Sequence, residues 1–85
     1  MRTFQYTITD ETGIHARPAG ALVKLVRGMK SRVILSVDGR EADAGKLMAV
    51  MAMGIGNGQT VTVQVSGPDE DEAAEKIQGF FKENL

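Results

Sequence analysis

The chain switches between two hydrophobic periods, and their order predicts its secondary structure. A period of two, typical of strands with one buried face, runs through residues 3–8, 32–37 and 60–66. A helical period, with apolar residues at i, i+3, i+4 and i+7, runs from Pro18 to Arg27. A second long helical pattern follows Asp69 and continues almost to the last residue. The switch between periods separates strands from helices along the whole chain.

Short elements and turns fill the remaining segments. Asp38-Gly39 predicts a two-residue type I′ hairpin, because that turn needs positive φ at both central positions, and a short strand is expected from Arg40. Residues 47–53 form an apolar segment of two helical turns, closed by Gly54. The predicted order is therefore β-α-β-β-α-β-α.

The final helix begins with a cluster of acids. Asp69 and Glu72 have the spacing of a capping box, and acids in a first turn suit the positive end of the helix dipole. The expected buried stripe consists of Ala73, Ala74, Ile77, Phe80 and Phe81.

Four strands and three helices in this order predict one α+β domain spanning residues 1–85. Strands that alternate in polarity favour an antiparallel sheet with one face toward water. We therefore expect a two-layer, open-faced sandwich in which three helices cover one face of a four-stranded antiparallel sheet.

Composition narrows the functional classes. The net charge of −1 gives no electrostatic reason to expect a nucleic-acid partner. The chain has no cysteine, which fits a reducing compartment, and a single histidine without thiols makes a poor zinc site. No segment approaches the roughly 20 apolar residues of a membrane span, and the first residues lack the apolar run of a signal peptide. We expect a small cytoplasmic protein that is not inserted in a membrane and holds no metal or cofactor.

Candidate chemistry is concentrated in the segment GIHARPA, residues 13–19. It places His15 and Arg17 at a helix start, where unpaired backbone N–H groups and the helix dipole favour anions, phosphate in particular. A neutral His15 can attack phosphorus, and Arg17 can bind phosphate oxygens through two N–H groups. Pro18 gives up no needed hydrogen bond at such a position. From this pattern alone, a surface or capping histidine without chemistry stays an open alternative.

GIHARPA followed by an amphipathic helix resembles the active-site signature of the HPr family, the histidine-containing phosphocarriers of the bacterial phosphoenolpyruvate:sugar phosphotransferase system. The Asp38-Gly39 hairpin, the apolar segment Leu47–Ile55, the acidic start of the last helix and the chain length agree with the family as well. The resemblance therefore covers essentially the whole chain.

The resemblance implies a sequence of transfers and a set of residue roles. Enzyme I would phosphorylate His15 on its Nδ1 nitrogen, and the group would then pass to a sugar-specific enzyme IIA component. Arg17 would be the active-centre arginine. Supporting roles would fall to Thr12, Ala16 and Pro18. The chain would act as a monomeric phosphoryl carrier and not as an enzyme.

The resemblance also implies a docking surface on the first two helices. Flexible thioethers suit a carrier that must fit several partners. The alternative is that the methionines, Met53 among them, fill gaps in the core and that the basic side chains are merely solvated. The side chains expected to dock are Lys24, Arg27, Leu47, Met48 and Met51.

One position departs from the family pattern. In many Gram-positive members a serine opens the second helix and is phosphorylated by an ATP-dependent kinase, whereas this chain has Lys46, preceded by Gly45. Lysine cannot accept a phosphoryl group as serine does, so we predict that this regulation is absent. Loss of a serine cap typically costs about 1 kcal/mol, so we also expect a less regular start of the second helix.

Two other functions stay open on the sequence. An HPr-like paralogue in a regulatory relay, or in a dihydroxyacetone kinase system, would keep the chemistry of His15 with different partners. A non-catalytic interaction module would use the same scaffold with His15 as a capping residue. A stand-alone hydrolase has the least support, because no second histidine, cysteine or carboxylate pair accompanies His15.

Overall fold

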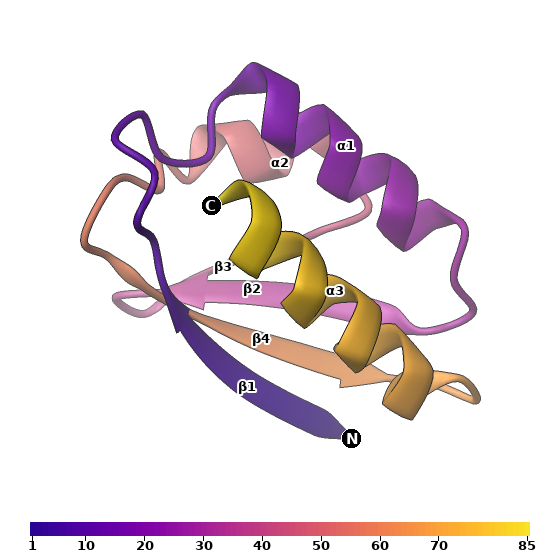
Figure 1. Ribbon diagram of the computed structural model, residues 1–85. Coiled ribbons are helices and arrows are strands. Elements are labelled where there is room, and N and C mark those ends of the chain that lie inside the picture. The colour runs from indigo at the N-terminus through magenta and orange to yellow at the C-terminus, as the bar shows by residue number, and fades with distance from the viewer.

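The computed structural model describes residues 1–85 and shows four strands and three helices in the expected order (Figure 1). The strands form one antiparallel sheet in the order β1-β4-β2-β3, and the helices lie on one side of it. The predicted α+β open-faced sandwich is confirmed. None of the helices has the length and apolar character needed to cross a membrane. The elements are β1 (Arg2–Thr7), α1 (Ala16–Arg27), β2 (Arg32–Val37), β3 (Arg40–Asp43), α2 (Leu47–Ala52), β4 (Thr60–Ser66) and α3 (Glu70–Asn84).

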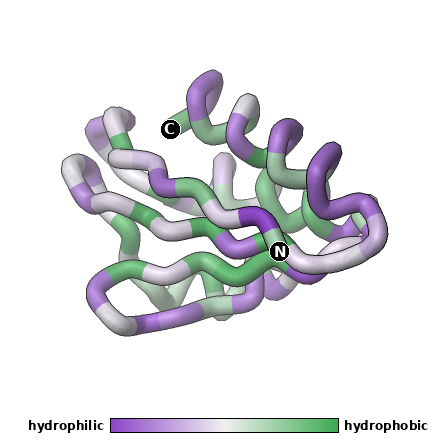
Figure 2. The backbone as a smooth tube through the Cα atoms, turned by 90° about the horizontal axis from the view of Figure 1, so that it is seen from below, coloured by the Kyte–Doolittle hydropathy of each residue, from purple (hydrophilic) through white to green (hydrophobic).

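Alternation along the two central strands produces the buried face of the sheet. In β4, Val61, Val63 and Val65 are completely buried, whereas the residues between them are partly exposed. Figure 2 shows this alternation of hydrophobic and hydrophilic positions along the strands. The register of β2 on β4 pairs Val33 with Val65 and Leu35 with Val63. The apolar side chains therefore form one continuous surface against which the helices pack.

An aromatic residue of α3 closes the core against β1. Phe81 is completely buried, and its ring meets the rings of Phe4 and Tyr6 edge to face, with centroids 6.1 and 5.5 Å apart. Phe80 is only partly buried, in contrast to the expectation, because it lines a groove between α1 and α3. The buried members of the predicted stripe are Ala73, Ala74, Ile77 and Phe81.

The hairpin between β2 and β3 has the predicted turn. Asp38 and Gly39 have φ values of 51° and 80°, as a type I′ turn requires, and Val37 pairs with Arg40 across it. The guanidinium of Arg40 donates to the carbonyl oxygen of Met53 at 2.9 Å. This hydrogen bond ties edge strand β3 to the end of α2.

Helix α2 begins regularly, so the expected irregular start is wrong. Lys46 is the N-cap residue in an extended conformation and provides no side-chain cap. The N–H of Val50 nevertheless donates to the Lys46 carbonyl at 3.1 Å, as in an ordinary first turn. The carboxylate of Asp43 accepts a hydrogen bond from the N–H of Gly45 at 2.8 Å. This bond stabilises the turn before the helix, and the helix starts normally without a serine cap.

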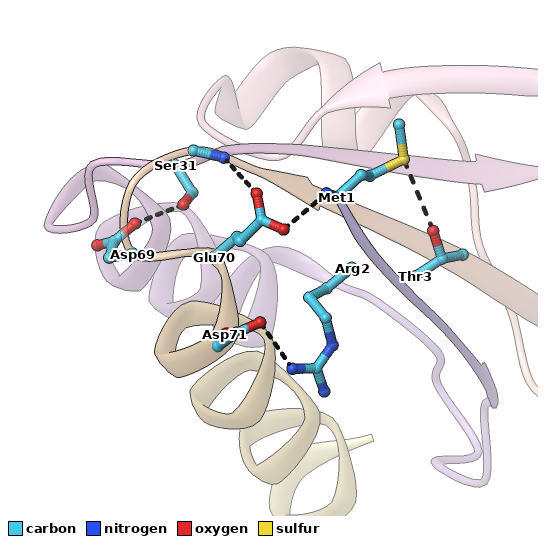
Figure 3. Close-up of polar contacts among 8 residues, drawn as sticks. Met1, Arg2, Thr3, Ser31, Asp69, Glu70 and Asp71 are labelled. Carbon is cyan, nitrogen blue, oxygen red and sulfur yellow. Dashed lines mark hydrogen bonds and ion pairs between the residues drawn. The ribbon is translucent and has the colours of Figure 1, made fainter.

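Helix α3 does not start with the predicted capping box. Asp69 is the N-cap residue but makes no side-chain hydrogen bond within the helix. Its carboxylate accepts a hydrogen bond from the backbone N–H of Lys30, at 3.0 Å. It also accepts one from the hydroxyl of Ser31 (Figure 3). Glu72 instead pairs with Lys76 one turn later, at 2.8 Å. The prediction failed because a partner distant in sequence takes the Asp69 carboxylate.

The other acids at the start of α3 bind the main chain and the first strand (Figure 3). Glu70 accepts a hydrogen bond from the N–H of Gly67 at 3.2 Å and lies 2.6 Å from the main-chain nitrogen of Met1. Asp71 forms an ion pair with Arg2 at 2.9 Å. These contacts place the first turn of α3 against the start of β1.

The hydrogen bonds to Asp69 predict an acid-sensitive contribution to stability. The N–H of Lys30 and then the hydroxyl of Ser31 lower the pKa of the Asp69 carboxyl below its ordinary value of 3.8. Because the pKa is lowered in the folded state, this stabilisation is complete above about pH 4 and is lost as the pH falls through the folded-state pKa. Asp69→Asn should therefore lower the free energy of unfolding at neutral pH, and the difference from the wild type should shrink toward pH 2.

Urea denaturation across this pH range measures the difference. Glu75→Gln is the control, because Glu75 is an exposed acid of α3 that forms no ion pair. For Glu75→Gln, the difference from the wild type in the free energy of unfolding should not shrink toward pH 2. A difference for Asp69→Asn that stays constant from pH 7 to pH 2 would contradict the assignment.

Candidate functional site

His15 occupies the N-cap position of α1. Its backbone is extended, with φ −94° and ψ −177°, and its carbonyl accepts a hydrogen bond from the N–H of Ala19 at 2.9 Å. The side chain is half-buried and makes no capping hydrogen bond. The capping role considered for His15 therefore lacks the hydrogen bond that it requires, and the ring is available for chemistry.

The start of α1 presents unpaired donors. The backbone N–H groups of Ala16 and Arg17 donate to no acceptor, and Pro18, the next residue, has no N–H. The first turn of α1 contains no acid, so no side chain of that turn offsets the positive end of the helix dipole. Two N–H donors and a positive potential therefore lie beside His15, an arrangement that favours an anion.

A pocket of about 380 Å³ opens beside the histidine. Arg17 is exposed and forms no ion pair, so its guanidinium is free to bind an anion in this pocket. Pro18 is buried beneath it at the third position of the helix. The residues lining the pocket are Asp10, His15, Arg17, Pro18, Ala21 and Asn84.

Three of the predicted site residues, His15, Arg17 and Pro18, meet in this pocket. The two others expected in supporting roles do not line it: Thr12 and Ala16 are exposed, and both are close to it only along the chain. The hydroxyl of Thr12 makes no hydrogen bond, whereas its backbone N–H is held by the carboxylate of Asp10 at 2.8 Å.

Asp10 and Asn84 line the pocket without having been predicted. The turn that Asp10 makes with Thr12 has a local signal, because aspartate commonly accepts a hydrogen bond from the N–H two residues later. Asn84 comes from the last turn of α3, where its amide donates to the carbonyl of Phe80 at 3.0 Å. No sequence signal links Asn84 to His15, because only the folded arrangement of α3 and the loop before α1 brings them together.

Close main-chain contact holds the loop that carries His15. Gly13 has φ 72°, and a Cβ at this position would lie 2.3 Å from the carbonyl oxygen of Ile55 and 2.6 Å from the Cα of Gly56. The next residue, Ile14, is buried, and its N–H donates to the same Ile55 carbonyl at 2.9 Å. Only glycine satisfies both the positive φ and the close approach at position 13.

The beginning of this loop is tied to two other segments. The N–H groups of Thr9 and Asp10 both donate to the carbonyl oxygen of Leu85, which is itself buried. The side-chain amide of Asn57 donates to the carbonyls of Thr9 and Asp10 at 3.2 and 3.4 Å. The loop is therefore fixed at its beginning by Leu85 and Asn57 and at its end by Ile55.

Helix α2 carries a set of exposed apolar side chains, which we call the α2 patch. Its members, Leu47, Met48 and Met51, are 42%, 80% and 39% exposed. Met53 is buried in the core instead. The methionines thus divide between the surface and the core, and the three side chains expected to dock are those that are exposed.

The two basic residues expected to dock, Lys24 and Arg27, are both exposed on α1. The Nε of Arg27 donates to the carbonyl of Gly45 at 2.8 Å and ties the end of α1 to the turn before α2. Lys24 forms no ion pair and lines the groove between α1 and α3. Arg27 therefore has a structural contact, whereas Lys24 has none of this kind.

An open-faced α+β sandwich with a histidine at the start of its first helix is the arrangement of a small phosphocarrier domain, and comparison with known proteins agrees. The family model of the HPr component of the phosphotransferase system, described as its phosphorylation site, matches residues 2–83. The chain belongs to the HPr family of phosphocarrier proteins.

Individual relatives support this membership. The chain is 41% identical over 71 residues to phosphocarrier protein HPr of Cupriavidus necator. The aligned residues cover 84% of this chain and 80% of that protein. The solved structure of the histidine-containing phosphocarrier protein of a Mycoplasma has a TM-score of 0.93 at 33% identity, covering 96% and 93% of the two chains. Crh, a catabolite repression protein of Bacillus subtilis described as a dimer with a swapped domain, has a TM-score of 0.78 at 32% identity, covering 94% and 92%.

The close approach at Gly13 predicts that this position does not tolerate a side chain. Gly13→Ala should lower the free energy of unfolding by more than about 3 kcal/mol, because a main-chain clash adds to the strain of a positive φ. Gly54→Ala is the matched control: φ is 59° there, but nothing lies within 4 Å of an added Cβ. For Gly54→Ala the free energy of unfolding should fall by only about 1–2 kcal/mol. Urea denaturation compares the two, and equal losses would contradict the role of the contact with Ile55.

Proposed function

We propose that this protein is a phosphocarrier of the phosphoenolpyruvate-dependent sugar phosphotransferase system. It accepts a phosphoryl group from Enzyme I on His15 and passes it to sugar-specific enzyme IIA components. The observation that carries the proposal is the position of His15 beside the unpaired N–H groups of Ala16 and Arg17. Membership of the HPr family supports the choice of partners. In this role the chain is a carrier and not an enzyme, uses no cofactor, and works in the cytoplasm.

The transfer exchanges one bond to phosphorus for another. Neutral His15 attacks the phosphorus of the phosphoryl group on Enzyme I through the lone pair of Nδ1. As the bond from Nδ1 to phosphorus forms, the bond from phosphorus to the donor atom of Enzyme I breaks, and its electron pair stays with that atom. In the transfer to a histidine of enzyme IIA, the bond from the acceptor nitrogen to phosphorus forms as the Nδ1–phosphorus bond of His15 breaks, and its electron pair returns to the His15 imidazole.

The start of α1 provides what this transfer demands of the carrier. Phosphoryl transfer requires mainly positioning and stabilisation of charge on the phosphoryl oxygens. In our proposal the N–H groups of Ala16 and Arg17 and the guanidinium of Arg17 bind these oxygens. Pro18 fixes the backbone at the third helical position, and Thr12 supports the loop through its hydrogen bond to Asp10.

Partner docking is assigned to the α2 patch together with Lys24 and Arg27. The exposed side chains of Met48 and Met51 support this assignment, because neighbouring exposed apolar side chains commonly mark an interaction surface and thioethers adapt to different partners. We propose that the carrier is a monomer. Strand β1 pairs with β4 of the same chain along its whole length, from Arg2 to Thr7, so the sheet is complete within one chain.

Labelling with phosphoenolpyruvate tests the proposal. With Enzyme I and labelled phosphoenolpyruvate, the wild type should acquire an acid-labile, base-stable phosphoryl group, and His15→Ala should acquire none. Arg17→Ala should be labelled on the order of tenfold more slowly or worse, because it loses a donor to the phosphoryl oxygens. Arg32→Ala, which removes an exposed cation at the start of β2, is the control and should match the wild type.

The same experiment separates the alternatives. An unlabelled wild type, or His15→Ala labelled as well as the wild type, would refute the phosphocarrier role and favour an interaction module. Discharge to an acceptor of a regulatory relay or of a dihydroxyacetone kinase system, but not to enzyme IIA, would favour the paralogue.

We also propose that regulation by the ATP-dependent kinase of Gram-positive relatives is absent, because Lys46 occupies the start of α2. The wild type should incorporate no phosphate from ATP in the presence of this kinase, whereas Lys46→Ser should gain one phosphate at position 46. The exposed, extended N-cap conformation of residue 46 suits a serine. Mass spectrometry checks the site, and phosphate on the wild type would contradict the proposal.

A further inference from the structure

A second groove, larger than the pocket beside His15, lies between α1 and α3. This α1/α3 groove encloses about 530 Å³. Its apolar walls are formed by Leu25 and Met29 from the α1 side and by Phe80 from α3, all of them partly buried. Ala21 and Gly28 leave the space open because neither has a large side chain. Apolar walls and a volume of this size are typical of binding grooves.

The charges around the groove have one sign. Lys24 of α1 and Lys76 of α3 line it, and no acid does. Lys24 forms no ion pair. Lys76 pairs with Glu72 at 2.8 Å, but both side chains are more than half exposed, so a carboxylate of a ligand can compete for the ammonium. The groove therefore complements an apolar ligand that carries negative charge.

The groove continues from the pocket of His15 along one face of α1. Ala21 lines both cavities. Arg17, Ala21, Lys24 and Gly28 are spaced at i, i+4, i+7 and i+11, which places them along the same side of the helix. Helix α1 packs against both α2 and α3 (Figure 1). A protein that covers His15 therefore has two directions in which to extend its contact, over the α2 patch and into the α1/α3 groove.

We propose that the α1/α3 groove is a second docking surface for a protein that exchanges phosphoryl groups with His15. This inference rests on the proposed function. The occupant is a segment of that partner in which a bulky apolar side chain is flanked by carboxylates. The apolar side chain fills the space over Gly28 between Leu25 and Phe80, and the carboxylates pair with Lys24 and Lys76. Continuity with the pocket of His15 favours a partner segment over a free small molecule.

Filling the groove tests the proposal without touching His15. Gly28 has φ −81°, and a Cβ there would lie 3.5 Å from its nearest neighbour, the carbonyl oxygen of Leu25, so the backbone accepts a side chain. Gly28→Leu occupies the groove, and Gly28→Ala is its matched control. Lys76→Glu reverses the charge on the other wall and lies on an exposed helix face, so it provides a second variant that does not depend on packing.

Steady-state phosphotransfer is measured for each variant with Enzyme I and with enzyme IIA. Gly28→Leu and Lys76→Glu should each raise KM for at least one of these partners about fivefold or more, with kcat unchanged. Gly28→Ala should change KM by less than about twofold. Urea denaturation establishes that each variant is folded.

Unchanged KM values for both partners in both variants would overturn the groove proposal while leaving the phosphocarrier role intact. A fall in kcat at unchanged KM would overturn it as well, because the substitutions would then act on His15 and not on docking. Failure of the wild type to be labelled by Enzyme I would instead refute the proposed function itself.

Discussion

The position of His15 depends on the close approach of two main-chain segments, at Gly13 and Ile55. The Ile55 carbonyl accepts the N–H of Ile14 and leaves no space for a side chain at position 13. Ile55 lies three residues after the end of α2 and Gly13 three residues before the start of α1, so this contact fixes the start of α1 against the end of α2. A reaction that relies on positioning loses rate steeply when reacting groups move by an ångström. The steric constraint at Gly13 therefore supports the proposed chemistry by holding the loop that carries His15.

The two long helices, α1 and α3, differ in the charge of their first turns. The first turn of α3 contains Glu70, Asp71 and Glu72, and the preceding Asp69 is bound by Lys30 and Ser31, so this helix start has its own negative charge. The first turn of α1 contains no acid and leaves two N–H groups unpaired. In one short chain, one helix dipole is offset by the protein's own acids and the other is left for a ligand. This difference leaves unpaired N–H donors and the positive end of a helix dipole beside His15, an arrangement that favours an anion.

The sequence predicted those features that depend on local pattern. Strand and helix order follow from hydrophobic period, the type I′ turn follows from Asp38-Gly39, and the family signature indicates His15 with Arg17. The error at the start of α3 arises because a residue distant in sequence binds the cap residue. Asp69 was expected to cap its own helix but binds Ser31, 38 residues away. Local spacing carries no information about such a competing partner.

Local sequence pattern also does not show which residues line the cavities. Asn84 lines the pocket of His15, and Phe80 is withdrawn from the core into the α1/α3 groove, because of how α3 packs beside α1. These positions depend on the packing of α3 against the sheet, including the contact of Phe81 with Phe4 and Tyr6. A helical period shows which face of a helix is apolar, but not which part of that face a neighbouring helix leaves uncovered.

The strand order has a consequence for synthesis of the protein. Strand β4 lies between β1 and β2, so Arg2 pairs with Val65, and β1 cannot join β2 and β3 in one sheet until β4 has been made. A nascent chain that ends before β4 already contains His15, but it lacks the sheet that supports α1 and the Leu85 carbonyl that holds Thr9 and Asp10. Pairing between segments so far apart in sequence slows folding, because the entropy of closing a long loop is lost before the contacts form. A chain that ends before β4 therefore presents His15 on a loop that these main-chain contacts do not hold.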